Sequence, residues 1–303
     1  MDTRALRFND ESIVHAAELI LAGEPVAMPT ETVYGLAADA TNGEAVARIY
    51  EAKGRPSFNP LIVHIEDLAA AERIGVIDET GRTLAMAHWP GPLTLVVPLR
   101  PHTKIASIVT AGLETIGLRV PAHPAMQALL KAVDRPLAAP SANASGSISP
   151  TRCEHVMRSL GGRIPLVIDG GASARGIEST IVALTDGRAR LLRPGPIVVE
   201  AEATSNGRIE APGQLASHYA PTKPLRLDAT ETEEDEYWIG FGDLAGDATL
   251  SATGDLVEAA ANLFALLYEA DASPFQRIAV APIPGVGLGA AINDRLRRAA
   301  ATR

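Results

Sequence analysis

The segment 26–36, VAMPTETVYGL, is a short apolar strand that ends in a polar turn. An amphipathic helix is predicted before it over 12–22, and a second helix after it over 44–52. A strand flanked by helices is typical of α/β proteins, in which ligands bind where strands end. The turn carries two threonine hydroxyls, a carboxylate and a phenol. It is therefore a candidate binding loop, although a capped turn explains the same pattern.

Strands and helices continue to alternate along the chain, which predicts an α/β fold with one sizeable mixed sheet. Strands are expected at 61–65, 93–99, 116–120, 137–139, 166–168, 180–184 and 190–192, and helices at 67–74, 79–88, 124–133 and 151–160. Thr151 and Glu154 match a capping box at the start of the helix over 151–160.

The chain is expected to divide into two domains. Residues 1–200 form the mixed-sheet domain, and the small polar residues after it predict a linker over 201–223. A second, smaller α/β domain follows over 224–303, with strands at 238–241 and 278–281 and a helix at 256–269. An acidic run over 231–236 in this domain is interpreted as a solvated face.

Composition excludes several classes of protein. Apolar residues make up 47 % of the 303 residues and charged residues 21 %, which is typical of a globular protein. The net charge of -9 argues against binding DNA or other nucleic acid over a broad surface. The sequence begins without the apolar core of a signal peptide, and its longest weakly polar stretch, 278–292, is shorter than the ~20 residues of a membrane-spanning helix. We therefore expect a cytoplasmic protein that does not contact membranes.

Cysteine and glycine patterns add no cofactor site. A single cysteine, Cys153, excludes an internal disulfide and a cysteine-rich zinc site. We interpret it as a buried thiol beside a surface imidazole, His155. Gly285, Gly287 and Gly289 lack the spacing and the following strand of a dinucleotide-binding motif. A tight turn that packs the last helix explains them better.

Four cations lie at or near the ends of predicted strands. Lys53 and Arg55 are two apart in a loop held by prolines, which suits a polyphosphate clamp but also a solvated basic loop. Arg119 interrupts an apolar strand and needs a partner, either a substrate carboxylate or a structural Asp or Glu. With Arg193 and the small, hydroxyl-rich stretch 139–149, they predict a cavity for a nucleoside triphosphate and a small carboxylate-bearing substrate.

The motifs PTETVYGL, KGRPSFNPL, WPGPLT, LRVPAHP, APSANASG, IESTIV and LLRPGP occur in this order between about residues 10 and 200. Together they resemble the YrdC-like L-threonylcarbamoyladenylate synthases. The stretch 212–221, PGQLASHYAP, resembles the linker of the long two-domain form. The resemblance implies a nucleotidyltransferase that makes threonylcarbamoyl-AMP and pyrophosphate from L-threonine, bicarbonate and ATP. It also implies a downstream partner, the threonylcarbamoyl transferase complex that modifies adenosine in tRNA.

The resemblance also implies roles for individual residues. The catalytic set on the nucleotide is Lys53, Arg55, Ser141 and Asn143. Further contacts to ATP are expected from Asn59, Thr115, Ser149, Arg193 and Tyr219. L-threonine is expected to contact Thr32, His64, Arg119, Ser179 and the backbone of Ala139, with Arg119 pairing its carboxylate. Mg²⁺ is expected to arrive on the phosphates of ATP, without a metal site in the protein.

Two other functions remain open at this point. The first is a related module that binds RNA without synthase activity, which an ATP-dependent pyrophosphate assay distinguishes. The second is a carbamoyl-adenylate enzyme of hydrogenase maturation that uses carbamoyl phosphate. That context requires zinc-finger modules, which a chain with one cysteine cannot supply.

Overall fold

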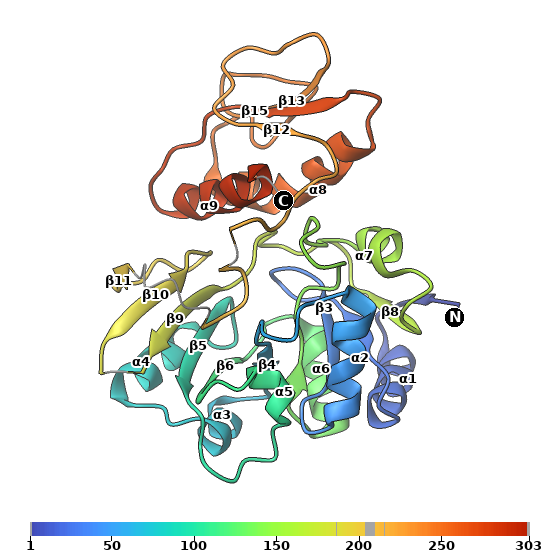
Figure 1. Cartoon of the computed structure of the whole chain (residues 1–303), viewed down its shortest axis with the longest axis vertical. Helices are drawn as coiled ribbons and strands as arrows, with labels where there is room; N and C mark the ends of the chain where they lie inside the picture. Colours follow the sequence, from blue (N-terminus) through green and yellow to red (C-terminus); the bar gives the residue numbers. More distant parts are fainter. Residues whose placement is uncertain (1, 186, 204–209, 215, 302–303) are drawn as a thin grey trace.

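The computed structural model describes residues 2–185, 187–203, 210–214 and 216–301. These residues form a large sheet and a small sheet in two domains, one above the other in Figure 1. The large sheet contains β1 (Arg4–Arg7), β2 (Val26–Met28), β3 (Gly35–Asp39), β4 (Ile62–His64), β5 (Leu93–Pro98), β6 (Thr115–Arg119), β7 (Leu137–Ala138), β8 (Leu166–Asp169), β9 (Thr180–Leu184), β10 (Ala189–Arg193) and β11 (Glu202–Ala203). The helices of the same domain are α1 (Asp10–Leu21), α2 (Gly43–Lys53), α3 (Leu68–Ile74), α4 (Glu79–His88), α5 (Ser107–Thr110), α6 (Pro124–Val133) and α7 (Cys153–Leu160).

The large sheet is mixed, as the alternating pattern predicted, with the order β1-β8-β2-β3-β7-β4-β6-β5-β9-β10-β11. Strand β4 pairs parallel to β6, which in turn pairs antiparallel to β5. The β4–β6 register places His64 opposite Arg119, although the two residues are far apart in the sequence. Sheet pairing therefore builds one end of the site described below.

Helices cover both faces of the large sheet because successive strand residues point to opposite sides. In β3, Leu36 joins the core cluster that contains Ile49 of α2, whereas Ala37 joins the cluster of Ile13 in α1 and Leu129 in α6. Within the described residues, no helix combines the length and the apolar character needed to cross a membrane.

The small domain contains β12 (Leu225–Arg226), β13 (Glu236–Gly240), β14 (Ala248–Thr249) and β15 (Arg277–Val280), with helices α8 (Leu256–Ala272) and α9 (Leu288–Ala300). Its parallel strands have the order β12-β15-β13-β14. Figure 1 shows α8 and α9 between this sheet and the large domain. A Cβ on Gly289 would lie 1.9 Å from the Pro284 carbonyl oxygen, which confirms the tight turn before α9.

The two domains are packed together. Val33, Ile148 and Ile177 of the large domain share one apolar cluster with Phe264 and other residues of α8 and α9. The Tyr268 hydroxyl donates a hydrogen bond to the Ile148 carbonyl at 2.8 Å. The expected linker is also packed in part, since it begins with β11 and its Ala220 forms a β-bridge with Ser147.

Several local predictions were wrong because distant residues override the local pattern. The capping box at 151–160 is absent: α7 begins at Cys153, and its N-cap Arg152 makes no side-chain cap. His155 is buried against Tyr268, with ring centroids 4.1 Å apart, so it is no surface imidazole, whereas Cys153 is buried as expected. In the acidic run, residues 231–235 are exposed as expected, whereas the last residue of the run, Glu236, is buried and accepts a hydrogen bond from Arg226.

Candidate active site

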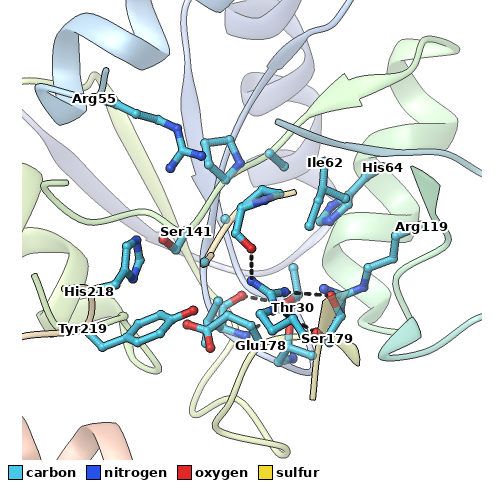
Figure 2. Close-up of a pocket in the computed structure, with 18 residues that line it drawn as sticks. Thr30, Arg55, Ile62, His64, Arg119, Ser141, Glu178, Ser179, His218 and Tyr219 are labelled. Atoms are coloured by element: carbon cyan, nitrogen blue, oxygen red, sulfur yellow. Dashed lines mark hydrogen bonds between the residues drawn. The ribbon is translucent and has the colours of Figure 1, made fainter. Parts of the chain in front are cut away.

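A cavity opens beside the large sheet, where several strand ends meet the segment that leads into the small domain. About 530 Å³ of space not filled by protein atoms lies in this cavity and in the open solvent at its mouth. The cavity is lined by many of the residues for which the family resemblance predicted substrate contacts: Thr32, Arg55, His64, Arg119, Ala139, Ser141, Ser179, Arg193 and Tyr219. Figure 2 shows Arg55 on one side of this space and His64 with Arg119 on the other. The polar motifs thus come together in one place.

Arg119 and Glu31 form an ion pair at one end of the cavity. Arg119 donates from Nη2 to Glu31 Oε1 at 2.6 Å and from Nε to the Gly91 carbonyl at 3.3 Å. The other carboxylate oxygen of Glu31 accepts the Ala122 N–H at 3.0 Å. Burial raises the pKa of Glu31, but the charge and hydrogen bond of Arg119 bring the net pKa below its ordinary value. The carboxylate of Glu31 is therefore ionised. It is the structural partner of Arg119, whose identity the sequence did not give.

His64 lies beside this ion pair. Burial and the neighbouring charge of Arg119 hold the pKa of His64 well below its ordinary value, so the ring is neutral. Its Nδ1 is buried and has no hydrogen-bond partner within the described residues. A buried ring nitrogen without a partner is costly, which favours a ligand polar group at this position.

The middle of the cavity is organised around Ser179, the residue immediately before β9. Its hydroxyl lies 2.8 Å from the Thr94 hydroxyl. Arg193 donates from Nη2 to the same hydroxyl at 3.1 Å and from Nε to the Ser179 carbonyl at 3.0 Å. The β5–β9 and β9–β10 pairings bring these three residues together. The Nη1 of Arg193 also donates to the Pro212 carbonyl at 3.4 Å, so all three guanidinium nitrogens help to hold Arg193 in place.

Arg55 is anchored at the other end of the cavity. It follows Gly54, whose left-handed backbone conformation (φ 59°) ends α2. Its Nη2 donates to the Pro60 carbonyl at 3.0 Å, so the loop holds its own cation. Burial lowers the pKa of Arg55 to about 10, and the side chain remains charged at neutral pH.

Comparisons with known proteins give the chain its family. A family model described as "Telomere recombination" matches residues 18–195, and one described as "Threonylcarbamoyl-AMP synthase, C-terminal domain" matches residues 175–301. The chain is 41 % identical to the threonylcarbamoyl-AMP synthase of Bacillus subtilis, covering 99 % of this chain and 96 % of that one. The chain belongs to the threonylcarbamoyl-AMP synthase family. It is also 38 % identical to the synthase of Pyrococcus abyssi, over 98 % of this chain and 96 % of that protein.

The fold agrees with this family over both domains. A crystal structure of P. abyssi Sua5 complexed with L-threonine matches with a TM-score of 0.90 at 35 % sequence identity, and covers 99 % of this chain and 98 % of that one. The family and the α/β fold with a second domain were both predicted from the sequence motifs. Membership also confirms the expectation that the chain is an enzyme of the nucleotidyltransferase type.

Some residues that the family resemblance singled out do not line the cavity: Lys53, Asn59, Thr115, Asn143 and Ser149. Lys53 was expected in a loop, but it is the buried last residue of α2. Its ammonium group donates to the carbonyls of Ser141 and Asn143 and so ties α2 to the loop after β7. Burial, together with the charge of Arg55, lowers the pKa of Lys53 well below its ordinary value.

The remaining members of this group also contact protein atoms. Thr115 lines a separate small cavity beside Pro60 and Pro212. The Ser149 hydroxyl donates to Glu178, and the Asn143 amide donates to the Ser147 carbonyl at 2.8 Å. The buried side-chain oxygens of Asn59 and Asn143 have no hydrogen-bond partner in the described part of the chain. Their roles toward ATP stay predictions.

Sequence reasoning assigned no role to several members of the site, among them Glu31, Thr94, Glu178 and His218. Glu31 lies within the PTETVYGL motif, where the partner required by Arg119 was the available signal. Thr94 and Glu178 belong to the quoted motifs WPGPLT and IESTIV, but no pattern in the sequence around them indicates that they belong to the site. Only the pairing of β5 with β9 shows that Thr94 faces Ser179.

Proposed function

We propose that this cavity binds ATP next to L-threonine and forms threonylcarbamoyl-AMP and pyrophosphate, with bicarbonate as the third substrate. One observation carries the proposal: Arg55, Arg119 and Arg193, from separate parts of an acidic chain, line a single cavity. Their exposed fractions are only 8 %, 4 % and 4 %. These three guanidinium groups outnumber the neighbouring carboxylates, Glu31 and Glu178, so the cavity favours anions, and the two substrates supply a carboxylate and a triphosphate.

L-threonine is assigned to the end that holds Arg119 and His64. The guanidinium pairs the substrate carboxylate, while Glu31 and the Gly91 carbonyl keep it in place. Thr32, Ser179 and the backbone of Ala139 complete this end in the proposal; all three line the cavity. The similar P. abyssi protein was crystallised with L-threonine, which supports L-threonine as a substrate.

ATP is assigned to the Arg55 end of the cavity, which extends to Arg193 in the middle. Ser141 and Tyr219 line the same end, and Lys53 acts on it by fixing the loop that carries Ser141. Four further residues, which do not line the cavity, are proposed to contact the nucleotide when it binds: Asn59, Thr115, Asn143 and Ser149.

Magnesium fits this site through ATP and not through a protein cage. Within the described residues, no group of three or more His, Cys, Asp or Glu side chains is arranged to hold a metal ion. Glu178, the carboxylate that lines the cavity, is engaged by Ser149 and Arg295. The phosphate oxygens of ATP would hold Mg²⁺ together with water, and the ion would supply charge neutralisation.

The reaction needs no covalent protein intermediate. Bicarbonate takes up a proton and loses water to give CO₂. The neutral threonine amine then adds to CO₂, which forms the C–N bond of a carbamate and releases a proton. A carbamate oxygen then attacks the α-phosphorus of ATP, the bond to the β-phosphate breaks, and pyrophosphate leaves. The protein contributes by holding both substrates in line and by placing positive charge beside the triphosphate.

The product is proposed to pass to the threonylcarbamoyl transferase complex that modifies tRNA, in the cytoplasm. The net charge of -9 supports placing tRNA with that complex instead of on a broad surface of this chain.

The test is mass spectrometry of the product made from ATP, bicarbonate and L-threonine, with L-serine as the substrate control. We expect threonylcarbamoyl-AMP and an equal amount of pyrophosphate, both dependent on L-threonine. Pyrophosphate release that stays at the level without threonine would overturn the proposal. RNA binding without any ATP turnover would instead support the RNA-binding alternative.

A further inference from the structure

Arg295 of α9 extends from the small domain to the wall of the cavity. Its side chain is completely buried. Its Nε donates to Glu178 Oε2 at 2.8 Å, and its Nη1 donates to Asp294 Oδ2 at 2.8 Å. A fully buried guanidinium is costly, and removing one partner of such a pair leaves an uncompensated charge. The ion pair therefore couples the small domain to the wall of the active site.

Glu178 is the carboxylate that needs this partner. It lines the cavity, and its second oxygen accepts the hydroxyl hydrogen of Ser149. Burial raises the pKa of Glu178, but the charges of Arg295 and Arg193 bring the net pKa below its ordinary value. Glu178 is therefore ionised at neutral pH. Without a balancing cation, its negative charge would repel a triphosphate in the same cavity.

The same guanidinium also contacts Tyr219. The Arg295 Cζ lies 5.4 Å from the centroid of the Tyr219 ring, within the range of a cation–π contact. Phe264 of α8 contacts the ring too, with centroids 5.6 Å apart. Tyr219 has a backbone φ of 64°, which is strained for a tyrosine and persists only when its surroundings hold it. Two small-domain side chains thus hold a residue that lines the cavity.

We propose that Arg295 is a positioning residue of the nucleotide site: it neutralises Glu178 and holds Tyr219, so that docking of the small domain completes the ATP end. This inference rests on the proposed function, because it takes ATP as the ligand of that end. It assigns a task to the small domain, whose own sheet lies away from the cavity. Arg295 itself does not line the cavity and acts through its two neighbours.

The experiment is calorimetric titration of the full chain with Mg-ATP and, separately, with L-threonine. We expect Arg295→Gln to weaken ATP binding roughly 10- to 100-fold, because a buried carboxylate loses its partner and Tyr219 loses a contact. L-threonine binding is expected to change less than about twofold, since Arg119 keeps its own partners. Arg297→Gln is the matched control, because Arg297 is an exposed residue of the same helix.

Two further variants separate positioning from general stability. Arg295→Lys keeps the charge without the planar fork, and we expect a folded protein with intermediate ATP affinity. The double variant Glu178→Gln/Arg295→Gln removes both charges, and we expect it to bind ATP more tightly than Arg295→Gln alone. If Arg295→Gln does not fold, the comparison of Arg295→Lys with the native chain decides the question.

Unchanged ATP affinity in folded Arg295→Gln, or in folded Arg295→Lys if Arg295→Gln does not fold, would overturn the inference. An equal loss of ATP and L-threonine binding would overturn it too, because that result indicates a structural role only. A native chain that binds ATP but makes no product would refute the proposed function and leave the comparison of variants valid. A native chain that binds no ATP would overturn both.

Discussion

Replacing Arg119 with methionine should weaken the use of L-threonine far more than the use of ATP. The substitution keeps the aliphatic stem and removes the guanidinium that is proposed to pair the substrate carboxylate. A hydrogen bond to a charged group contributes about 1.5–3 kcal/mol. At about 1.4 kcal/mol for each tenfold change, the apparent KM for L-threonine should rise roughly 10- to 150-fold. The KM for ATP should stay within about twofold, because Arg55 and Arg193 keep their own anchors.

The same substitution also removes the partner of Glu31, and the effect on stability has to be measured separately. Losing one member of a buried pair costs about 3–5 kcal/mol. The Glu31 side chain is 12 % exposed and keeps its hydrogen bond from Ala122, so we expect a value near the lower end. Adding Glu31→Gln to Arg119→Met should recover much of this loss, since a neutral amide tolerates burial better than a carboxylate.

The assay is pyrophosphate release, with each substrate varied in turn, together with urea unfolding of every variant. Arg135→Met is the matched control, because Arg135 also forms a 2.6 Å ion pair, with buried Asp39, and does not line the active-site cavity. It should lose stability without a change in either KM. The reasoning would be refuted if Arg119→Met raised both KM values equally, or if Arg135→Met had the same effect on L-threonine.

Further predictions concern the ATP end and the response to pH. Arg55→Ala should abolish ATP turnover while leaving the fold intact, and unchanged pyrophosphate release would contradict the clamp. Gly213→Ala should raise the KM for ATP about tenfold, because its φ is 83° and its Cβ would lie 2.6 Å from the Tyr219 hydroxyl; an unchanged KM would argue against this placement of Tyr219. Burial lowers the pKa of His218 from 6.5 to about 3, so the unfolded chain gains a proton there and stability falls as the pH drops below 6.5. Urea unfolding should show that this residue lowers the free energy of unfolding by about 2 kcal/mol at about pH 5. His218→Gln should remove that part of the pH dependence. An identical pH dependence in both proteins would be inconsistent with a buried neutral ring.

Local patterns predicted the regular elements well where a residue's neighbours in sequence decide its conformation. The helices α4 and α6 and the strand β9 have the predicted limits. Their apolar spacing is local, and the helix caps Asp78 and His123 immediately precede the helices. Strand β3 escaped prediction, since Gly35–Asp39 consists largely of small residues with little β-propensity. It is a strand because β2 and β7 pair with it on either side.

The sequence by itself determined the α/β class, the order of the polar motifs and the requirement that Arg119 have a partner, because apolar periodicity and unpaired charge are local properties. Only the tertiary structure decided that this partner is Glu31, that Lys53 is buried against the loop after β7, and that Arg295 reaches Glu178 from the other domain. Each of these contacts joins segments that are distant along the chain. Their geometry depends on strand order and on the packing of the two domains. Both result from many weak contacts between distant segments, so the sequence of any single segment does not predict them.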